Sequence, residues 1–225
     1  MFLTLTGVLP PDRIDAVRTA AEALTWKPGE LTAGPRARAV KKNLQADLTD
    51  ARGLAVQEML LSAVSAHPVL RAAAWPKRFS PLLLSRTEPG GGYGRHVDNA
   101  LIGRDFARLR TDLSFTLFLS DPETYEGGEL AIETPAGTYT AKPDAGSLVL
   151  YPSGAIHEVM PVTRGVRLVC AGWIESEIAD ASARETLFEL ENLRITLGEA
   201  FPATSPVPLA LDKVIGTLIR RWARQ

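Results

Sequence analysis

The spacing of apolar residues changes twice along the chain, from helical to strand-like and back to helical. Before residue 78, apolar side chains recur every three or four residues in two segments. This spacing predicts helices from Pro11 to about Leu24 and from about Arg52 to Ala66. Proline suits the start of the first helix, and His67-Pro68 ends the second, because a residue before proline avoids helical backbone angles. The stretch Val40–Gln45 has no clear period and is interpreted as a short strand or an extended arm.

Between Phe79 and Trp173 the period becomes two, which is typical of half-buried strands. The segment 112–120 alternates most clearly, with one face formed by Leu113, Phe115, Leu117 and Leu119 and the other by Ser114, Thr116 and Ser120. Turns containing glycine or proline separate further short strands, at about 81–85, 129–133, 138–141 and 147–151. Many short strands at regular spacing predict a sandwich or barrel, and a closed jelly roll suits a central site.

After Trp173 the helical spacing returns. A helix is predicted from about Ala181 to Leu197, with Gly198 as its C-terminal stop, followed by a linker over Pro202–Pro208. The last helix carries a wide apolar stripe, formed by Leu211, Val214, Ile215, Leu218, Ile219 and Trp222. Such a stripe must be buried, and we expect it to pack against the barrel rather than against a second subunit.

These patterns predict a fold that is mainly β with flanking helices (α+β) around a double-stranded β-helix, or jelly-roll, core. We expect an N-terminal helical and mixed segment over residues 1–77 that packs on the barrel. The jelly-roll core spans residues 78–177, and a C-terminal helical extension spans residues 178–225. A chain of 225 residues is long enough to bury one substantial core.

Composition and charge narrow the class of protein. The chain has 25 basic and 26 acidic residues, and a net charge of −1 gives no broad field for nucleic acid or an anionic membrane. The apolar start, 1–9, is short and lacks a basic region, so we expect neither a signal peptide nor a membrane span. The single cysteine, Cys170, lies in an apolar run and is expected to be a buried thiol. These features predict a cytoplasmic protein.

The candidate chemistry lies in the segment 93–100. His96 and Asp98 are two residues apart, so on an extended strand their side chains leave the same face. An imidazole and a carboxylate, joined by a second histidine, form the facial triad of non-haem Fe(II) oxygenases, which leaves positions open for substrate and dioxygen. The chain has three histidines. His157 is the candidate third ligand, because His67 is interpreted as a solvated residue at a helix end.

Arg167 follows His157 by ten residues. A glycine turn at 163–165 would fold the two strands into a hairpin, with Arg167 opposite Pro161 on the face that His157 shares. Roughly 13 Å of strand, at about 3.3 Å per residue, would separate that point from His157, enough for a short dicarboxylate between metal and guanidinium. An inward-facing guanidinium needs an anion, and its planar fork matches a carboxylate. An H-x-D tripeptide alone is a weak signal, but with this histidine and arginine it is much more specific.

With these residues the sequence resembles the PKHD-type hydroxylases, bacterial relatives of the prolyl-4-hydroxylases among the iron- and 2-oxoglutarate-dependent dioxygenases. The matching motifs are Tyr93-Gly94-Arg95-His96-Val97-Asp98-Asn99-Ala100, Asp112-Leu113-Ser114, Gly127-Gly128-Glu129-Leu130, Tyr151-Pro152-Ser153, His157, and Pro161-Val162-Thr163-Arg164-Gly165-Val166-Arg167, with Thr32-Ala33-Gly34 and Lys42-Asn43-Leu44-Gln45 nearer the N-terminus. The likeness covers nearly the whole chain and weakens after about Glu191. Thr87 stands where the family usually has a tyrosine.

The resemblance implies a double-stranded β-helix that holds Fe(II) on His96, Asp98 and His157. It also implies that 2-oxoglutarate chelates the iron through its keto acid and reaches Arg167 with its far carboxylate. Hydroxylation of a C–H bond would release succinate and CO2, and L-ascorbate is a reductant that such enzymes use. No catalytic residue beyond the metal site is expected, and a homodimer is in keeping with the family.

Two other functions remain open at the level of sequence. One is a cupin-type metal enzyme that works without 2-oxoglutarate. The other is a non-catalytic iron-binding or sensing module on the same kind of barrel. No residue specifies whether the substrate is a small molecule or a peptide.

Overall fold

The computed structural model describes residues 1–32, 34–105, 108–202 and 204–223, apart from the side chains of residues 35 and 36. Ala33 of the N-terminal motif and the end of the chain at 224–225 therefore lie outside the described residues. The α-helices are α1 (Pro11–Glu22), α2 (Pro35–Arg38), α3 (Ala51–Ala66), α4 (Pro68–Ala74), α5 (Ala181–Ala200) and α6 (Pro206–Trp222). Short 3-10 turns cover Gly29–Thr32 and Pro122–Thr124.

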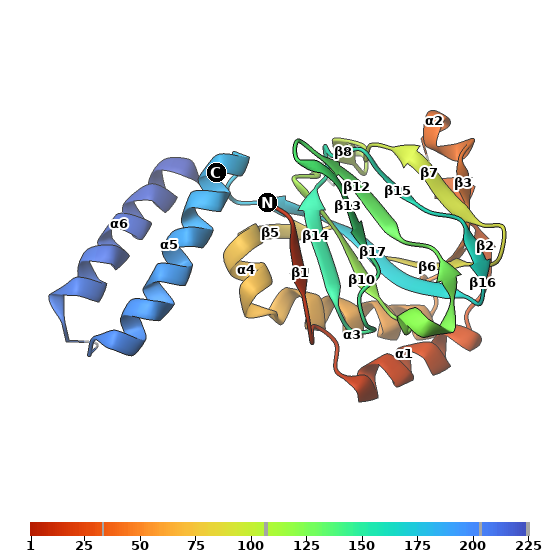
Figure 1. Ribbon diagram of the computed structural model, residues 1–225, viewed down its shortest axis with the longest axis horizontal. Coiled ribbons are helices and arrows are strands. Elements are labelled where there is room, and N and C mark those ends of the chain that lie inside the picture. The colour runs from red at the N-terminus through yellow and green to blue at the C-terminus, as the bar shows by residue number, and fades with distance from the viewer. Residues whose placement is uncertain (33, 106–107, 203, 224–225) are drawn as a thin grey trace.

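Two antiparallel sheets face each other and form the predicted jelly-roll core (Figure 1). The larger sheet runs in the order β1 (Leu3–Leu5), β14 (Leu148–Pro152), β10 (Leu113–Phe118), β17 (Arg167–Ser176), β6 (Leu83–Thr87), β4 (Leu44–Ala46) and β2 (Trp26–Pro28), with β5 (Pro76–Phe79) also paired to β17. The smaller sheet runs in the order β13 (Gly137–Ala141), β12 (Leu130–Thr134), β15 (His157–Val159), β7 (Gly92–His96) and β3 (Lys41–Lys42). Two short pairs join β8 (Leu101–Ile102) to β9 (Leu109–Arg110) and β11 (Glu126–Gly127) to β16 (Val162–Arg164).

Strand β10 shows why the alternating pattern matters. Every residue of β10 is buried, so its polar face does not meet solvent. Leu113, Phe115 and Leu117 point into the core beneath the helices, whereas Ser114 and Thr116 line the cavity between the sheets. The predicted alternation is therefore present, but it separates a helix-covered face from a site-facing one.

The helices near the N-terminus cover the outer face of the larger sheet (Figure 1). The apolar side of α1 is buried at Ile14 and Val17, and that of α3 at Val56, Leu60 and Val64. These side chains share one core with β10, β14 and β17. The buried Cys170 belongs to this core, and burial raises the pKa of its thiol to about 12. Its surroundings match the inert thiol expected from the sequence.

The segment from residue 29 to residue 46 joins the edges of both sheets. Strand β4 pairs with β6 of the larger sheet, and β3 pairs with β7 of the smaller one, with Lys41 opposite Tyr93. The stretch that had no clear period in the sequence is thus two short strands, which close one end of the cavity between the sheets.

The sequence correctly predicted where α3 ends, but it did not predict α4 and it misplaced the end of α5. His67-Pro68 ends α3 but also begins α4, because proline is accepted in a first helical turn and the His67 ring accepts a hydrogen bond from the Leu70 amide at 3.4 Å. Gly198 was expected to stop α5, yet the helix continues to Ala200. No atom lies within 4 Å of a side chain built at Gly198, and the chain leaves the helix just before Pro202.

Most of the apolar stripe of α6 packs against α5 and not against the barrel, whereas Val214 is exposed. Ile215 is buried against Leu187 and Ala183 of α5, and Trp75 after α4 joins the same cluster. The α5–α6 hairpin stands to the side of the barrel (Figure 1). Among the described residues, no helix combines the length and the apolar character that crossing a bilayer requires.

We expect Gly146→Ala to lower the free energy of unfolding by about 2–4 kcal/mol, measured by urea denaturation. Gly146 has a φ of +84°, and a Cβ there would lie 2.3 Å from the Leu9 carbonyl oxygen. Gly7→Ala is the matched control, because Gly7 has a φ of +66° with no atom within 4 Å of its added Cβ. The control should lose about 1–2 kcal/mol. Equal losses in the two variants would contradict the role of the close approach to Leu9.

Candidate metal centre

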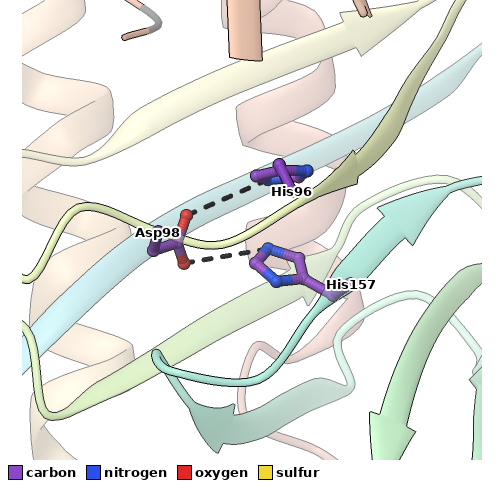
Figure 2. Close-up of side chains that lie close together, drawn as sticks. All are labelled: His96, Asp98 and His157. Atoms are coloured by element: carbon purple, nitrogen blue, oxygen red, sulfur yellow. Dashed lines mark ion pairs between the residues drawn. The ribbon is translucent and has the colours of Figure 1, made fainter. Parts of the chain in front are cut away.

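Three side chains of the smaller sheet and its adjoining loop converge on one point (Figure 2). His96 is the last residue of β7 and His157 the first of β15, and the two are directly opposite in the strand register. Asp98 follows two residues after the end of β7, so it lies in a loop and not on the strand that the sequence predicted. The cross-strand pairing and the short loop bring together all three residues predicted from the sequence.

The distances between the three groups suit a shared cation. The Asp98 carboxylate lies 3.9 Å from His96 Nε2 through Oδ1 and 3.7 Å from His157 Nε2 through Oδ2. These distances are too long for hydrogen bonds. Two ligands that are each about 2.1 Å from one ion can lie up to about 4.2 Å apart, so both distances fit that arrangement. One donor atom from each residue lies within 4.8 Å of the other two.

Hydrogen bonds to the backbone fix which nitrogen of each imidazole is free. His96 Nδ1 lies 2.8 Å from the Gly94 carbonyl oxygen, and His157 Nδ1 lies 3.0 Å from that of Ala155. A carbonyl oxygen can only accept, so each Nδ1 carries the proton and each Nε2 keeps its lone pair. Both lone pairs belong to the nitrogen atoms nearest to Asp98, as metal ligation requires.

Burial and aromatic packing hold the imidazoles in place. The Tyr93 ring stacks on His96 with centroids 3.5 Å apart, and Tyr151 meets His157 edge-on at 5.0 Å. Burial, followed by the nearby His157, lowers the pKa of His96 to about 4. The His96 imidazole is therefore neutral at neutral pH, and its Nε2 is available as a ligand.

The carboxylate of Asp98 is oriented from the larger sheet. The Ser114 hydroxyl of β10 donates to Asp98 Oδ2 at 2.6 Å, and the Ser153 hydroxyl lies 2.8 Å from that of Ser114. Both serines are buried. The polar face of β10 thus supplies the hydrogen bond that holds the carboxylate, a role that the alternation alone could not indicate.

Arg167 lines the same cavity, but the strand pairing that brings it there differs from the one that the sequence predicted. The proposed hairpin with Arg167 opposite Pro161 is wrong: β17 pairs with β6 and β10, and Arg167 lies opposite Thr87. Gly165 does adopt the left-handed conformation, with a φ of +72°, but its turn leads from β16, which pairs with β11, to β17 of the larger sheet. The guanidinium is therefore positioned across the barrel from the metal ligands, by the larger sheet.

The charge of Arg167 has no partner within the described protein. The side chain is 2% exposed, and its Nε and Nη2 are buried without a hydrogen bond. Its guanidinium carbon lies 5.2 Å from the centre of the Phe118 ring. Burial lowers the pKa of Arg167, which reflects the cost of holding a cation there. A buried guanidinium with free donors fits a ligand carboxylate.

Tyr125 lies beside Arg167, although it does not line the cavity and the sequence did not indicate it. Its ring is 1% exposed, and its hydroxyl is buried without a hydrogen-bond partner among the described residues. A Cβ at Gly128 would lie 2.9 Å from Arg167 Cδ and 3.0 Å from Tyr125 Cε2, so glycine is required where these two side chains meet. Tyr125 lies in a loop outside the alternating segments, where periodicity carries no signal.

One cavity of about 280 Å³ contains the three candidate ligands and Arg167. Its wall between them is largely apolar and includes Leu130, Tyr151, Val159 and Val169. This volume is close to the lower end of the range for small-ligand pockets, about 300 Å³, and it suits a ligand as small as a five-carbon diacid. The donor set, two imidazole nitrogens and one carboxylate, fits a ferrous ion with open positions, and Arg167 fits a carboxylate bound beyond it.

Comparison with known proteins agrees with this geometry. Residues 82–175 match the family model of the 2OG-Fe(II) oxygenase superfamily. A PKHD-type hydroxylase from Hyphomonas neptunium is 49% identical over 222 residues, which cover 99% of each chain.

Solved structures share the fold. A prolyl-4-hydroxylase from Pseudomonas putida is 25% identical with a TM-score of 0.51, covering 78% of this chain and 92% of that one. A prolyl hydroxylase from Trichoplax adhaerens, solved with a peptide fragment of the hypoxia inducible factor oxygen degradation domain, has a TM-score of 0.61. It is 18% identical and covers 78% of this chain and 84% of its own. These likenesses support the jelly-roll fold predicted from the sequence.

We expect His157→Ala to weaken Fe(II) binding by on the order of 100-fold or more, since even the partners of metal ligands contribute about 10–100-fold. Anaerobic titration with Fe(II), followed by metal analysis of the desalted protein, measures the effect. His67→Ala is the matched control, because His67 lies at the junction of α3 and α4, away from the other two histidines. Wild-type affinity in His157→Ala, or an equal loss in His67→Ala, would contradict this assignment.

Proposed function

This chain belongs to the PKHD-type hydroxylases, which are 2-oxoglutarate-dependent oxidoreductases of the 2OG-Fe(II) oxygenase superfamily, and we propose that it hydroxylates a C–H bond of its substrate. In this reaction one atom of dioxygen enters the product and the other enters succinate, while 2-oxoglutarate loses CO2. The observation that carries the proposal is one cavity that holds both the His96, Asp98 and His157 cluster and an unpaired buried arginine.

We assign the ferrous ion to His96 Nε2, Asp98 and His157 Nε2. When bound, the iron supplies the redox chemistry that activates dioxygen. The chain contributes geometry: β7 and β15 hold the imidazoles, and Ser114 holds the carboxylate through its hydrogen bond. Three protein ligands on one side leave the other positions free for the cosubstrate and dioxygen.

We assign the far carboxylate of 2-oxoglutarate to Arg167. Its planar fork offers two parallel donors, and the buried setting strengthens each charged hydrogen bond. The Tyr125 hydroxyl, also without a partner, lies beside it as a further donor. Thr87, opposite Arg167, has too short a side chain to supply the phenol that the family usually places there, and Tyr125 takes that part in this proposal.

The apolar wall of the cavity has a protective role in the proposal. Leu130, Val159 and Val169 line the cavity together with the candidate ligands and Arg167, and a bound diacid would leave little room for water beside them. Water exclusion suppresses side reactions of the activated site and strengthens the electrostatic contacts within it. L-ascorbate serves as an auxiliary reductant that keeps the metal ferrous, and it belongs in the assay.

The wild-type protein can be tested for 2-oxoglutarate binding at the iron and for incorporation of dioxygen into succinate and product. Anaerobic addition of Fe(II) and 2-oxoglutarate should give the visible charge-transfer band of a chelated keto acid. Exposure to ¹⁸O2 should then place one labelled atom in each succinate, and a substrate screen by mass spectrometry should find the second in a product. Bound iron without the band would indicate an iron-binding or sensing module instead.

Arg167→Ala should raise the Michaelis constant for 2-oxoglutarate on the order of 100-fold, since a hydrogen bond to a charged group contributes about 1.5–3 kcal/mol. Succinate formation against 2-oxoglutarate concentration measures it. Arg164→Ala is the matched control: this arginine lies on β16, is exposed, and pairs with Glu126 at the surface. The control should behave as the wild type. An unchanged constant in Arg167→Ala would favour a cupin-type metal enzyme that works without 2-oxoglutarate.

A further inference from the structure

A second buried cation lines the cavity that contains Arg167. Lys41 lies on β3 and is 7% exposed. Its ammonium group donates to the Thr32 hydroxyl at 3.1 Å, and no described carboxylate forms an ion pair with it. Burial lowers the pKa of Lys41 to about 8, and Asp98 opposes this effect. The ammonium therefore stays charged at neutral pH, although its burial is costly.

Aromatic stacking fixes the position of Lys41 relative to the metal ligands. Its Nζ lies 5.1 Å from the centre of the Tyr93 ring, and that ring centre lies 3.5 Å from the centre of the His96 imidazole. The ammonium is thus separated from His96 by no more than the sum of these two distances. A substrate group bound to the Lys41 ammonium would therefore lie near the candidate metal ligands, a few bonds from the part of the substrate that reacts.

Other polar groups line the cavity together with Lys41. Thr32 Oγ1 lies 2.6 Å from Gln45 Oε1 and 3.0 Å from the Gly29 carbonyl oxygen, so its proton goes to one of these acceptors, while the Gln45 amide nitrogen is a donor. Gln45 is 6% exposed and lines the cavity. Trp173 also lines it, with an indole N–H that is buried without a partner, and Asn43 Oδ1 is a buried acceptor in the same lining. The Lys41 ammonium, the Gln45 amide and the Trp173 indole are donors, and they suit an acceptor that carries negative charge.

Charge balance gives the same result once iron and 2-oxoglutarate are assigned as proposed above. The ferrous ion and the dianionic cosubstrate cancel each other, and Asp98 offsets Arg167. Lys41 then remains as one net positive charge among buried side chains of the cavity. An uncompensated charge in such surroundings is strongly unfavourable, so the substrate is expected to bring one negative charge.

We propose that Lys41 is the counter-ion for a carboxylate of the substrate, so that this hydroxylase acts on a carboxylic acid. This inference rests on the proposed function. The cavity of about 280 Å³ must hold the cosubstrate together with the reacting part of the substrate, which favours a small free acid. The carboxyl terminus of a peptide is the other source of the same chemistry. Lys41 selects and positions the substrate and takes no part in bond breaking.

Acetate is the probe, and acetamide is its neutral isostere. Protein loaded anaerobically with Fe(II) and saturating 2-oxoglutarate is titrated with ¹³C-labelled acetate, whose relaxation the paramagnetic ion enhances only at short range. Wild-type protein should show saturable enhancement with acetate, and at least tenfold weaker binding of acetamide. Lys41→Met should weaken acetate binding at least tenfold, whereas Lys41→Arg, which keeps the charge, should stay within about threefold of the wild type.

Lys42→Met is the matched control, because Lys42 is the exposed neighbour on the same strand, and it should bind acetate as the wild type does. The charge-transfer band of each loaded variant reports whether its iron and cosubstrate are bound. Wild-type acetate affinity in Lys41→Met, equal binding of acetamide, or no saturable acetate binding would each overturn the proposal. Loss of the band in the wild type would instead contradict the proposed function.

Succinate formation during turnover distinguishes a small free acid from the carboxyl terminus of a peptide as the source of the carboxylate. Free L-amino acids and short peptides are each compared with their primary amides for stimulation of succinate formation. Stimulation by free amino acids supports a small acid. Stimulation by peptide acids alone assigns the carboxylate to a chain terminus. Amides that stimulate as well as their acids would contradict a role for Lys41 as counter-ion.

Discussion

The register between β7 and β15 is the constraint on which the rest of the site depends. It places His96 directly opposite His157, although 61 positions separate them in sequence, and it puts both imidazoles on the face that looks into the barrel. Side chains alternate along a strand, so a slip of one residue would send an imidazole out of the cavity. The carbonyl groups of Gly94 and Ala155 then fix the imidazole tautomers, and the loop after β7 brings Asp98 to the free nitrogens.

The two sheets divide the work. The smaller sheet and the loop after β7 carry the candidate metal ligands and Lys41, and the larger sheet carries Arg167 and the hydroxyl that orients Asp98. The helices on the outer face of the larger sheet bury the apolar side of β10, which leaves its polar side for the cavity. Buried cations at Arg167 and Lys41 are costly for an empty protein. We propose that this cost is compensated on binding, by the cosubstrate at Arg167 and by the substrate at Lys41.

Much of this could be predicted from the sequence, because strand periodicity and the H-x-D motif are local signals. The same signals do not specify which strands pair, so Arg167 was placed in a hairpin with Pro161 when it lies opposite Thr87 in the other sheet. Tyr125 was missed because a loop residue has no periodicity. Local rules placed the end of α3 correctly at His67-Pro68, but they failed at Gly198, which does not stop α5, and they did not indicate α4. Tertiary packing decides these points, and sequence spacing does not contain it.

We assign one ferrous ion and one molecule of 2-oxoglutarate to a single cavity between the two sheets. Anomalous diffraction at the iron edge, from crystals grown anaerobically with Fe(II) and 2-oxoglutarate, tests this assignment. We expect one peak at bonding distance from His96 Nε2, Asp98 and His157 Nε2, with the far carboxylate of the cosubstrate on Arg167. An iron peak away from these three atoms, or a cosubstrate that leaves Arg167 without a partner, would contradict it.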